Sequence, residues 1–353
     1  MSFRMHAIGT ISLVAAVSSL ACTASTGAPE GTENVGQSNA ALSVYQWSND
    51  STVGGDAFAG ASIATYNYGG QDHTVMVHSG DDRGNVDIYW AVSDDGVSWS
   101  SDHKIDAMAS RNPAQIAAFN GYVYMLHTGE NDNQVWMSRF DGSTWSHDFM
   151  LPYTSSSTPA LASYNGALYI VGSTPGTGHL WQATMSTSET FSGTTEIAGA
   201  IFVGTPSLTV HCASTFCFPA TLFGAYSGPN NAVMMSGRQA TYSRRGVNTT
   251  WWTPWVVQNA DGSVKQTTTP PAIASYGGML HMLRTVPAQA DAIKWTYYDG
   301  SNWSYDVSIG DQRMYVPSES RYGDTAYNPS ASLAARADKL VMVHLSSTEG
   351  HDN

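Results

Sequence analysis

Apolar residues along the chain occur in short runs separated by glycine-containing turns. Tyr122–Leu126 is apolar throughout and follows Asn120-Gly121, and Leu168–Val171 follows Asn165-Gly166 after one residue. Asn-Gly favours a two-residue hairpin turn, and a short, wholly apolar run is typical of a strand buried on both faces. These segments therefore predict antiparallel strands.

The strand pattern repeats with a nearly constant period. Trp90 and Trp136 are 46 residues apart, and Trp136 and Trp181 are 45 apart. Each copy has a run of small residues, a hairpin turn, an apolar second strand, a third strand with a Trp, a turn that is usually Asp-Gly, and a fourth strand that begins at a second Trp. Four antiparallel strands in roughly 40–50 residues are characteristic of a β-propeller blade.

Six copies can be counted, the last of them split between the two ends of the chain. The final copy stops after two strands at His344, whereas Trp47–Asp50 matches the start of a fourth strand, as in Trp99–Asp102. We therefore expect an all-β fold, a six-bladed propeller of four-stranded blades in which an N-terminal strand completes the C-terminal blade and leaves no open edge. Five or seven blades stay open, because the split copy has no clear third strand. The copies are Asp56–Ile105, Pro113–Leu151, Pro159–Ile197, Pro206–Val257, Pro271–Ile309 and the split one.

The first residues have the pattern of a secretory signal. Arg4 precedes an apolar run from Ala7 to Val17, and small residues follow up to Ala21, so we predict a signal peptide over residues 1–21. Ser19–Cys22 resembles the lipobox of bacterial lipoproteins and implies lipidation of Cys22, although Ser19 stands where that motif has Leu. A secreted protein and an outer-surface lipoprotein of a bacterium therefore both remain open. Residues 22–42 predict a flexible tether, and residues 43–353 a single propeller domain.

Net charge limits the classes of partner, and the cysteines suggest a covalent cross-link. The chain has 15 basic and 28 acidic residues and a net charge of −13, which argues against nucleic acid and leaves a lipid anchor as the only expected membrane contact. Cys212 and Cys217 flank the hairpin of the fourth copy. Export to an oxidising compartment predicts a disulfide between them. The sequence does not indicate an oligomeric state.

Two phrases of the repeat point to a family. Pro159–Tyr169 and Asp299–Ser304 resemble repeats of bacterial and fungal propeller lectins of the fucose-lectin type and related secreted propeller-repeat proteins. The resemblance extends from about residue 43 to 346. It implies sugar pockets between neighbouring blades, formed by aromatic rings with Arg and Glu. An Arg and Glu pair does not recur with the Trp here, so the sugar is left open.

Two recurrent positions are candidate ligand-binding residues. The third-strand tryptophans can stack on sugar rings, or they can pack between sheets as core. The residues that end the second strand can ring the mouth of the central channel, line gaps between blades, or bond structurally to a loop carbonyl. The first set is Trp90, Trp136, Trp181 and Trp295, and the second is His78, His127, Tyr226, Arg284 and His344.

Two functions compete, with glycans or polysaccharide as the partner in both. The first is a lectin-like, carbohydrate-binding propeller. The alternative is a polysaccharide lyase or glycoside hydrolase with His127, Tyr226, Arg284 and His344 as its catalytic groups. A scaffold that binds protein through its loops is a third possibility. No nucleophile elbow, zinc-protease motif or phosphate loop occurs.

No metal or cofactor is assigned from the sequence. Two acidic loops can nevertheless take Ca²⁺ through carboxylate oxygens, or they can simply be solvated. Their residues are Asp81, Asp82, Asp87, Glu130 and Asp132.

Overall fold

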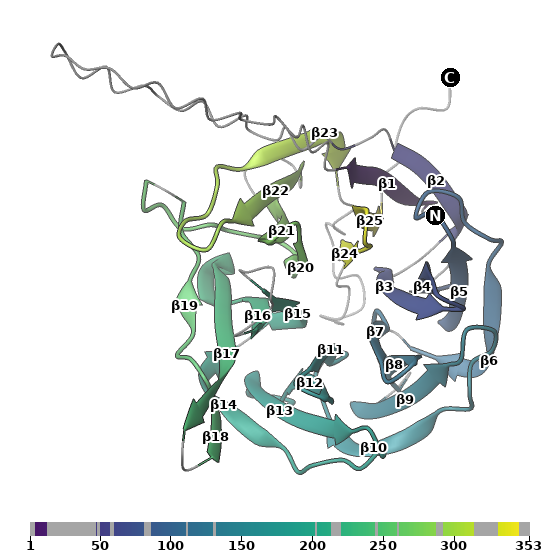
Figure 1. The fold of residues 1–353 in the computed structure, drawn as a ribbon, viewed down its shortest axis with the longest axis horizontal. Coiled ribbons are helices and arrows are strands. Elements are labelled where there is room, and N and C mark those ends of the chain that lie inside the picture. The colour runs from purple at the N-terminus through teal and green to yellow at the C-terminus, as the bar shows by residue number, and fades with distance from the viewer. Residues whose placement is uncertain are drawn as a thin grey trace, which may run out of the picture.

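Six antiparallel sheets surround a central axis in the computed structural model (Figure 1). Five of them have four strands, and the sixth has four strands plus a short fifth. This is a β-propeller, and the predicted count of six blades is confirmed. The structure describes residues 4–12, 47, 50–56, 60–80, 86–110, 112–129, 132–201, 203–212, 220–243, 246–259, 261–286, 292–313 and 331–345.

The first three blades follow one another along the chain. Blade 1 contains β3 (Ser62–Tyr68), β4 (Gln71–Ser79), β5 (Asp87–Ser93) and β6 (His103–Ala109). Blade 2 contains β7 (Gln115–Phe119), β8 (Tyr122–Thr128), β9 (Gln134–Phe140) and β10 (Phe149–Thr154). Blade 3 contains β11 (Ala160–Tyr164), β12 (Ala167–Ser173), β13 (His179–Ser186) and β14 (Thr195–Ile201).

The remaining blades include an enlarged one and a composite one. Blade 4 contains β15 (Val203–His211), β16 (Thr221–Ser227), β17 (Val233–Ser243) and β18 (Gly246–Trp251), with a 3-10 helix η1 (Pro229–Asn231) and a short β19 (Trp255–Val256) paired to β17. Blade 5 contains β20 (Ala272–Tyr276), β21 (Met279–Val286), β22 (Ala292–Tyr298) and β23 (Val307–Arg313). Blade 6 contains β24 (Ser332–Ala335), β25 (Lys339–Leu345), β1 (Arg4–Ser12) and β2 (Asp50–Asp56).

The N-terminal part of the chain closes the ring with two strands. β1 pairs antiparallel with β25, from Met5 opposite Leu345 to Ser12 opposite Lys339, and β2 pairs with the other edge of β1. The expected completion of the last blade by an N-terminal strand is thus confirmed for β2. The third strand, which had no clear candidate, is Arg4–Ser12. These residues lie inside the predicted signal peptide, and one segment cannot be both removed on export and retained in the mature blade.

Turn residues set the hairpin registers. Asn120 and Gly121 have φ of 50° and 82°, the left-handed pair that a two-residue type I′ turn requires. Phe119 consequently lies opposite Tyr122 in the β7–β8 pair. Asn165-Gly166 forms the same turn in blade 3.

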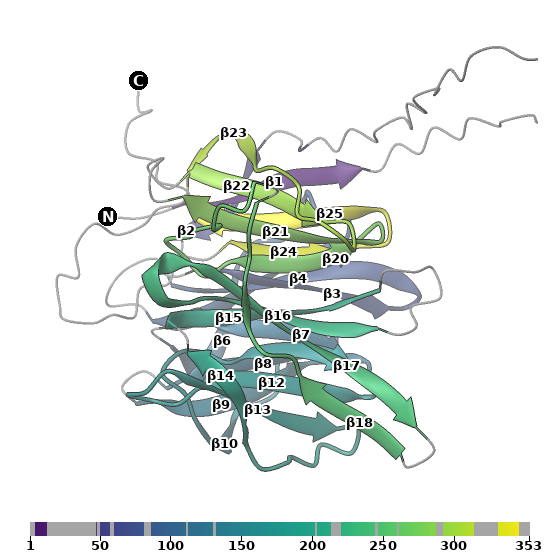
Figure 2. The same ribbon diagram turned by 90° about the vertical axis from the view of Figure 1, so that its left-hand side faces the viewer.

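The core lies between the faces of neighbouring blades. One cluster joins Val77 and Ile88 of blade 1 to Ile116, Met125 and Phe140 of blade 2. The second strand of each blade is covered on both faces, as its apolar sequence predicts; in β8 every residue after Tyr122 is buried. In the side view the blades overlap one another across the molecule (Figure 2). No helix in the described part of the chain is long and apolar enough to cross a membrane.

Candidate functional site

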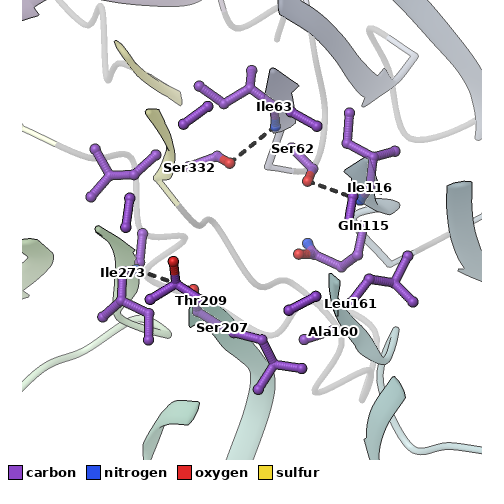
Figure 3. Close-up of a pocket in the computed structure, with 18 of the residues that line it drawn as sticks. Ser62, Ile63, Gln115, Ile116, Ala160, Leu161, Ser207, Thr209, Ile273 and Ser332 are labelled. Atoms are coloured by element: carbon purple, nitrogen blue, oxygen red, sulfur yellow. Dashed lines mark hydrogen bonds between the residues drawn. The ribbon is translucent and has the colours of Figure 1, made fainter. Parts of the chain in front are cut away.

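The central channel is lined by the first strand of every blade (Figure 3). Its cavity measures about 290 Å³, and the described residues that line it are mostly Ala, Ser, Thr, Pro and Ile, without a charged side chain. Serine hydroxyls join neighbouring blades here. The backbone N–H of Ile116 donates to Ser62 Oγ at 3.2 Å, and two similar bonds run from Ile63 N to Ser332 Oγ and from Ile273 N to Ser207 Oγ. The described channel wall therefore provides no acid, base or charged ligand.

The histidines that end the second strands are buried inside their own blades. His127 Nε2 lies 3.2 Å from Asp148 Oδ2, and its Nδ1 donates to Thr128 O at 3.2 Å. His78 repeats this arrangement with Asp102, also at 3.2 Å. Each Asp lies three residues after the second Trp of its repeat. The prediction that the fourth strand begins at this Trp is wrong, because β6 begins at His103 and β10 at Phe149, after a turn. The pairs therefore tie the end of the second strand to the fourth-strand turn of the same blade.

The other members of this set are also buried, in different blades. Arg284 in β21 forms an ion pair with Asp306, Tyr226 lies in β16 and His344 in β25. Burial raises the pKa of the Tyr226 hydroxyl. None of the five predicted residues lines the channel. The structure thus does not bring His127, Tyr226, Arg284 and His344 together as a catalytic group would require.

The third-strand tryptophans are part of the packing between blades. Trp181 and Trp295 are buried, and Trp90 and Trp136 are half-buried. The Trp90 ring packs 4.9 Å from that of Phe140 in the next blade. Trp181 and Trp295 are therefore core residues, and they have no free face on which a sugar ring could stack.

Carboxylates in the repeated Asp-Gly turns accept hydrogen bonds from backbone N–H groups. The N–H groups of Thr144 and Ser143 donate to Asp141 at 2.8 Å and lower the pKa of its carboxyl to about 2. The N–H groups of Asn302 and Ser301 lower the pKa of Asp299 in the same way. Such carboxylates stay ionised at working pH, so they cannot act as the general acid of a glycosidase.

The predicted calcium and disulfide residues are only partly described. Asp87 forms an ion pair with Lys104 at 2.6 Å, and Asp132 accepts the Gln134 N–H. Asp81, Asp82 and Glu130 lie outside the described residues. The described residues include no group of three His, Cys, Asp or Glu able to hold a metal ion. Cys217 and Cys22 also lie outside the described residues, so the Cys212 disulfide and the lipidation stay predictions.

An aromatic cavity lies between blades 4 and 5, and we call it the blade 4–5 groove. It measures about 460 Å³. Blade 4 contributes three rings, of which Trp252 and Trp255 have centroids 6.2 Å apart and an interplanar angle of 38°. Blade 5 contributes two rings with centroids 5.5 Å apart. Met235, Val257 and Leu280 also line it. The five rings are Phe223, Trp252, Trp255, Tyr298 and Trp303.

Neutral amides complete the lining of this groove. They are the side chains of Gln258, Asn259 and Asn302. Asn259 is held in place, because Lys265 Nζ donates to its Oδ1 at 2.6 Å and its Nδ2 donates to Ser263 Oγ at 2.9 Å. Lys265 is completely buried and forms an ion pair with Asp306 at 2.8 Å. A buried ionic network thus connects the groove wall to the turn of blade 5.

The exposed ring of Trp252 results from a local departure from the repeat. In four blades a Ser follows the aromatic residue that precedes the fourth strand, and the N–H of this Ser donates to a third-strand carbonyl, as Ser146 does to Arg139 O. In blade 4 the same backbone bond runs from Trp252 to Gly237 O at 2.7 Å, so Trp252 occupies the Ser position. A Cβ on Gly237 would lie 2.6 Å from Trp252 Cε3. Only glycine therefore leaves room for the ring, which is 42% exposed.

The repeated sequence pattern did not point to this groove. It selected tryptophans that recur, whereas Trp252 is the residue that breaks the recurrence. The signal was present as Trp251-Trp252 in place of Trp-Ser, together with Gly237 in the third strand. The partner rings Tyr298 and Trp303 come from the next repeat, so the adjacency of the two blades was needed to join them.

Comparison with known proteins gives the fold. No protein-family model matches the chain, and no curated protein does. Among solved structures, the chain is similar to the fungal Aleuria aurantia lectin, described as a six-bladed β-propeller with a novel fucose recognition mode; the TM-score is 0.52 at 12% identity, over 82% of this chain and 88% of the lectin. The GH43_1 enzyme from Xanthomonas citri complexed with xylotriose gives a TM-score of 0.43 at 12% identity, over 69% of this chain and 89% of that one. The likeness to the lectin agrees with the β-propeller fold described above.

Proposed function

We propose that this protein is a lectin-like, non-catalytic propeller that binds carbohydrate in the blade 4–5 groove. The observation that carries the proposal is the combination of a cavity of about 460 Å³ with five aromatic rings and three neutral amides. The apolar faces of sugars stack on aromatic rings, and amides both donate to and accept from hydroxyls. The cavity volume is in the range of roughly 300–1,000 Å³ usual for small-molecule sites. The fold is also one that a fungal lectin uses to recognise fucose.

The charge of the groove supports binding rather than catalysis. Its described lining contains no carboxylate, histidine or cation. Hydrolysis of a glycosidic bond normally uses two carboxyl groups on either side of that bond, and elimination needs a base and a charge neutraliser. The described groove has neither arrangement, and no observation favours the enzymatic alternative.

We also propose that the protein is exported, on the basis of the signal-like pattern over residues 1–21. Mass spectrometry of the protein isolated from its own cells tests this. A mature N-terminus at or near Cys22, with or without lipid, supports export. Retention of Arg4–Ser12 would instead mean that β1 is a permanent strand of blade 6.

A glycan array followed by calorimetry with the purified protein tests the function. We expect at least one saccharide to bind, and Trp252→Ala to remove binding because the largest exposed ring of the groove is lost. Tyr305→Ala is the matched control, since Tyr305 is an exposed aromatic residue of blade 5 that does not line the groove. Binding to no saccharide on the array and in solution would overturn the proposal.

A further inference from the structure

The position of Trp252 can be compared in five blades whose residues there are described. In four of them the Ser hydroxyl accepts a hydrogen bond from a third-strand N–H, at 3.0–3.1 Å. The third-strand residue carries a side chain in each of these four blades. The pairs are Val92 with Ser100, Arg139 with Ser146, Thr184 with Ser192, and Tyr297 with Ser304. Blade 4 has Gly237 with Trp252 instead.

The equivalent place between blades 2 and 3 is occupied by the protein's own side chains. Arg139, which corresponds to Gly237, forms an ion pair with Glu189 of blade 3. Tyr124 OH donates to the same carboxylate at 2.9 Å, and Arg139 lies 4.7 Å above the ring centre of Tyr122. Opposite charges and an aromatic face thus satisfy one another there. In blade 4 the ring of Trp252 lies where a side chain at position 237 would be, and the groove beside this ring is open.

The exchange in blade 4 departs from the other four described blades in two ways. Trp252 has no hydroxyl to accept the third-strand N–H, and a glycine within a strand typically costs about 0.5–1 kcal/mol relative to alanine. The Trp252 ring nevertheless leaves 42% of its surface in solvent. A local break in the repeat that leaves an aromatic ring partly in solvent is typical of a functional site.

The charges around the groove select against anions. Lys265 behind the wall is fully buried and donates to Asn259, Ser304 O and Asp306, so it faces away from a ligand. Near the groove, Asp261 adjoins the lining residue Gly262, and Asp299 adjoins Tyr298. Hydrogen bonds from the Ser263 hydroxyl and N–H lower the pKa of Asp261. An acidic sugar would therefore find no cation among the described residues that line the groove, and two carboxylates are adjacent in sequence to that lining.

We infer that the Gly237 and Trp252 pair makes the blade 4–5 groove a single specialised site, which binds one neutral saccharide per chain with Trp252 as its stacking platform. This inference rests on the proposed function and adds to it the ligand class, the stoichiometry and the specificity-determining residue.

Calorimetry with neutral and acidic sugars of equal size tests the ligand class. The probes are methyl α-L-fucoside, xylobiose and cellobiose against galacturonic acid and digalacturonic acid. We expect a neutral sugar to bind with a stoichiometry near one, and its acidic counterpart to bind at least about tenfold more weakly. Comparable binding of the acidic sugar, two or more sites per chain, or tighter binding of choline through cation–π contacts would overturn the inference.

Substitutions of Trp252 test whether its ring is the stacking platform. Trp252→Ser restores the residue found in four other blades, so it is expected to fold normally and to lose about tenfold or more in affinity. Trp252→Phe keeps a smaller ring and should recover part of the loss, while Tyr305→Ala should bind as the wild type does. Unchanged affinity in Trp252→Ser overturns this inference alone. Failure of every sugar to bind the wild type overturns the proposed function itself.

Discussion

A buried histidine in blade 5 makes the stability of the protein sensitive to mild acid. His281 lies in β21, is completely buried and stacks on Trp295 with ring centres 5.7 Å apart and an interplanar angle of 8°. Trp295 Nε1 donates to His281 Nδ1 at 3.1 Å, so Nδ1 must be unprotonated. The other nitrogen, Nε2, donates to Tyr276 O at 3.1 Å. Only the neutral ring with its proton on Nε2 satisfies both bonds.

The size of the effect follows from the pKa. Burial lowers the pKa of His281 to about 4, from 6.5 in the unfolded chain. The unfolded state therefore binds the proton first as the pH falls, and the folded state loses relative stability between pH 6.5 and pH 4. At about 1.4 kcal/mol for each pKa unit, the full loss is about 3 kcal/mol, of which about 2 kcal/mol is reached at pH 5.

Urea unfolding at pH 7.5 and pH 5.0 measures this contribution. We compare the wild type with His281→Gln, whose amide can hold the same two bonds without titrating. The wild type should lose about 2 kcal/mol more than the variant between the two pH values. His147→Gln, at an exposed histidine of blade 2, should keep the wild-type pH dependence. Equal pH dependence of the wild type and His281→Gln would refute the reasoning.

Two further predictions concern packing and the buried network. Lys265→Met should lower the free energy of unfolding by about 2 kcal/mol, because Asp306 loses one of its two cationic partners and Ser304 O loses a donor; an unchanged urea midpoint would contradict this. Gly172→Ala should cost about 1–3 kcal/mol in thermal unfolding, because the new Cβ would lie 2.4 Å from Trp181 Cζ2. Gly193→Ala is the control for the second variant, since no atom lies within 4 Å of a Cβ there, and it should change stability by less than about 0.5 kcal/mol.

Most of the fold could be predicted from the sequence repeat. Pro113–Leu151 was predicted as one blade, and β7 to β10 occupy Gln115–Thr154. Turn chemistry made this possible, because Asn-Gly and Asp-Gly fix local geometry without distant contacts. The third strand of blade 6 was missed because Arg4–Ser12 is an apolar run behind a basic residue, a pattern that a signal peptide shares with a buried strand.

The candidate site was hidden for a physical reason. Recurrence marks what all blades need, and the recurrent Trp181 and His127 are needed for packing and for tying a strand to a turn. Burial depends on the neighbouring blade, which the residues of a single copy do not encode. Trp252 and Gly237 are 15 residues apart because blade 4 has a lengthened hairpin, so their contact was also invisible from spacing.

The serine hydrogen bonds around the channel have a consequence for how a propeller can gain blades by duplication. Between Ser62 and Ile116, and between Ser207 and Ile273, the joint consists of one hydroxyl on one blade and one backbone N–H on the next. Such a hydrogen bond does not depend on the side chain of the residue in the neighbouring blade, because every residue except proline supplies the backbone N–H. A duplicated copy that carries the serine therefore meets this requirement at once, whatever sequence follows it. Blades can then diverge on their outer parts, as blade 4 has done, while the inner ring keeps its connections.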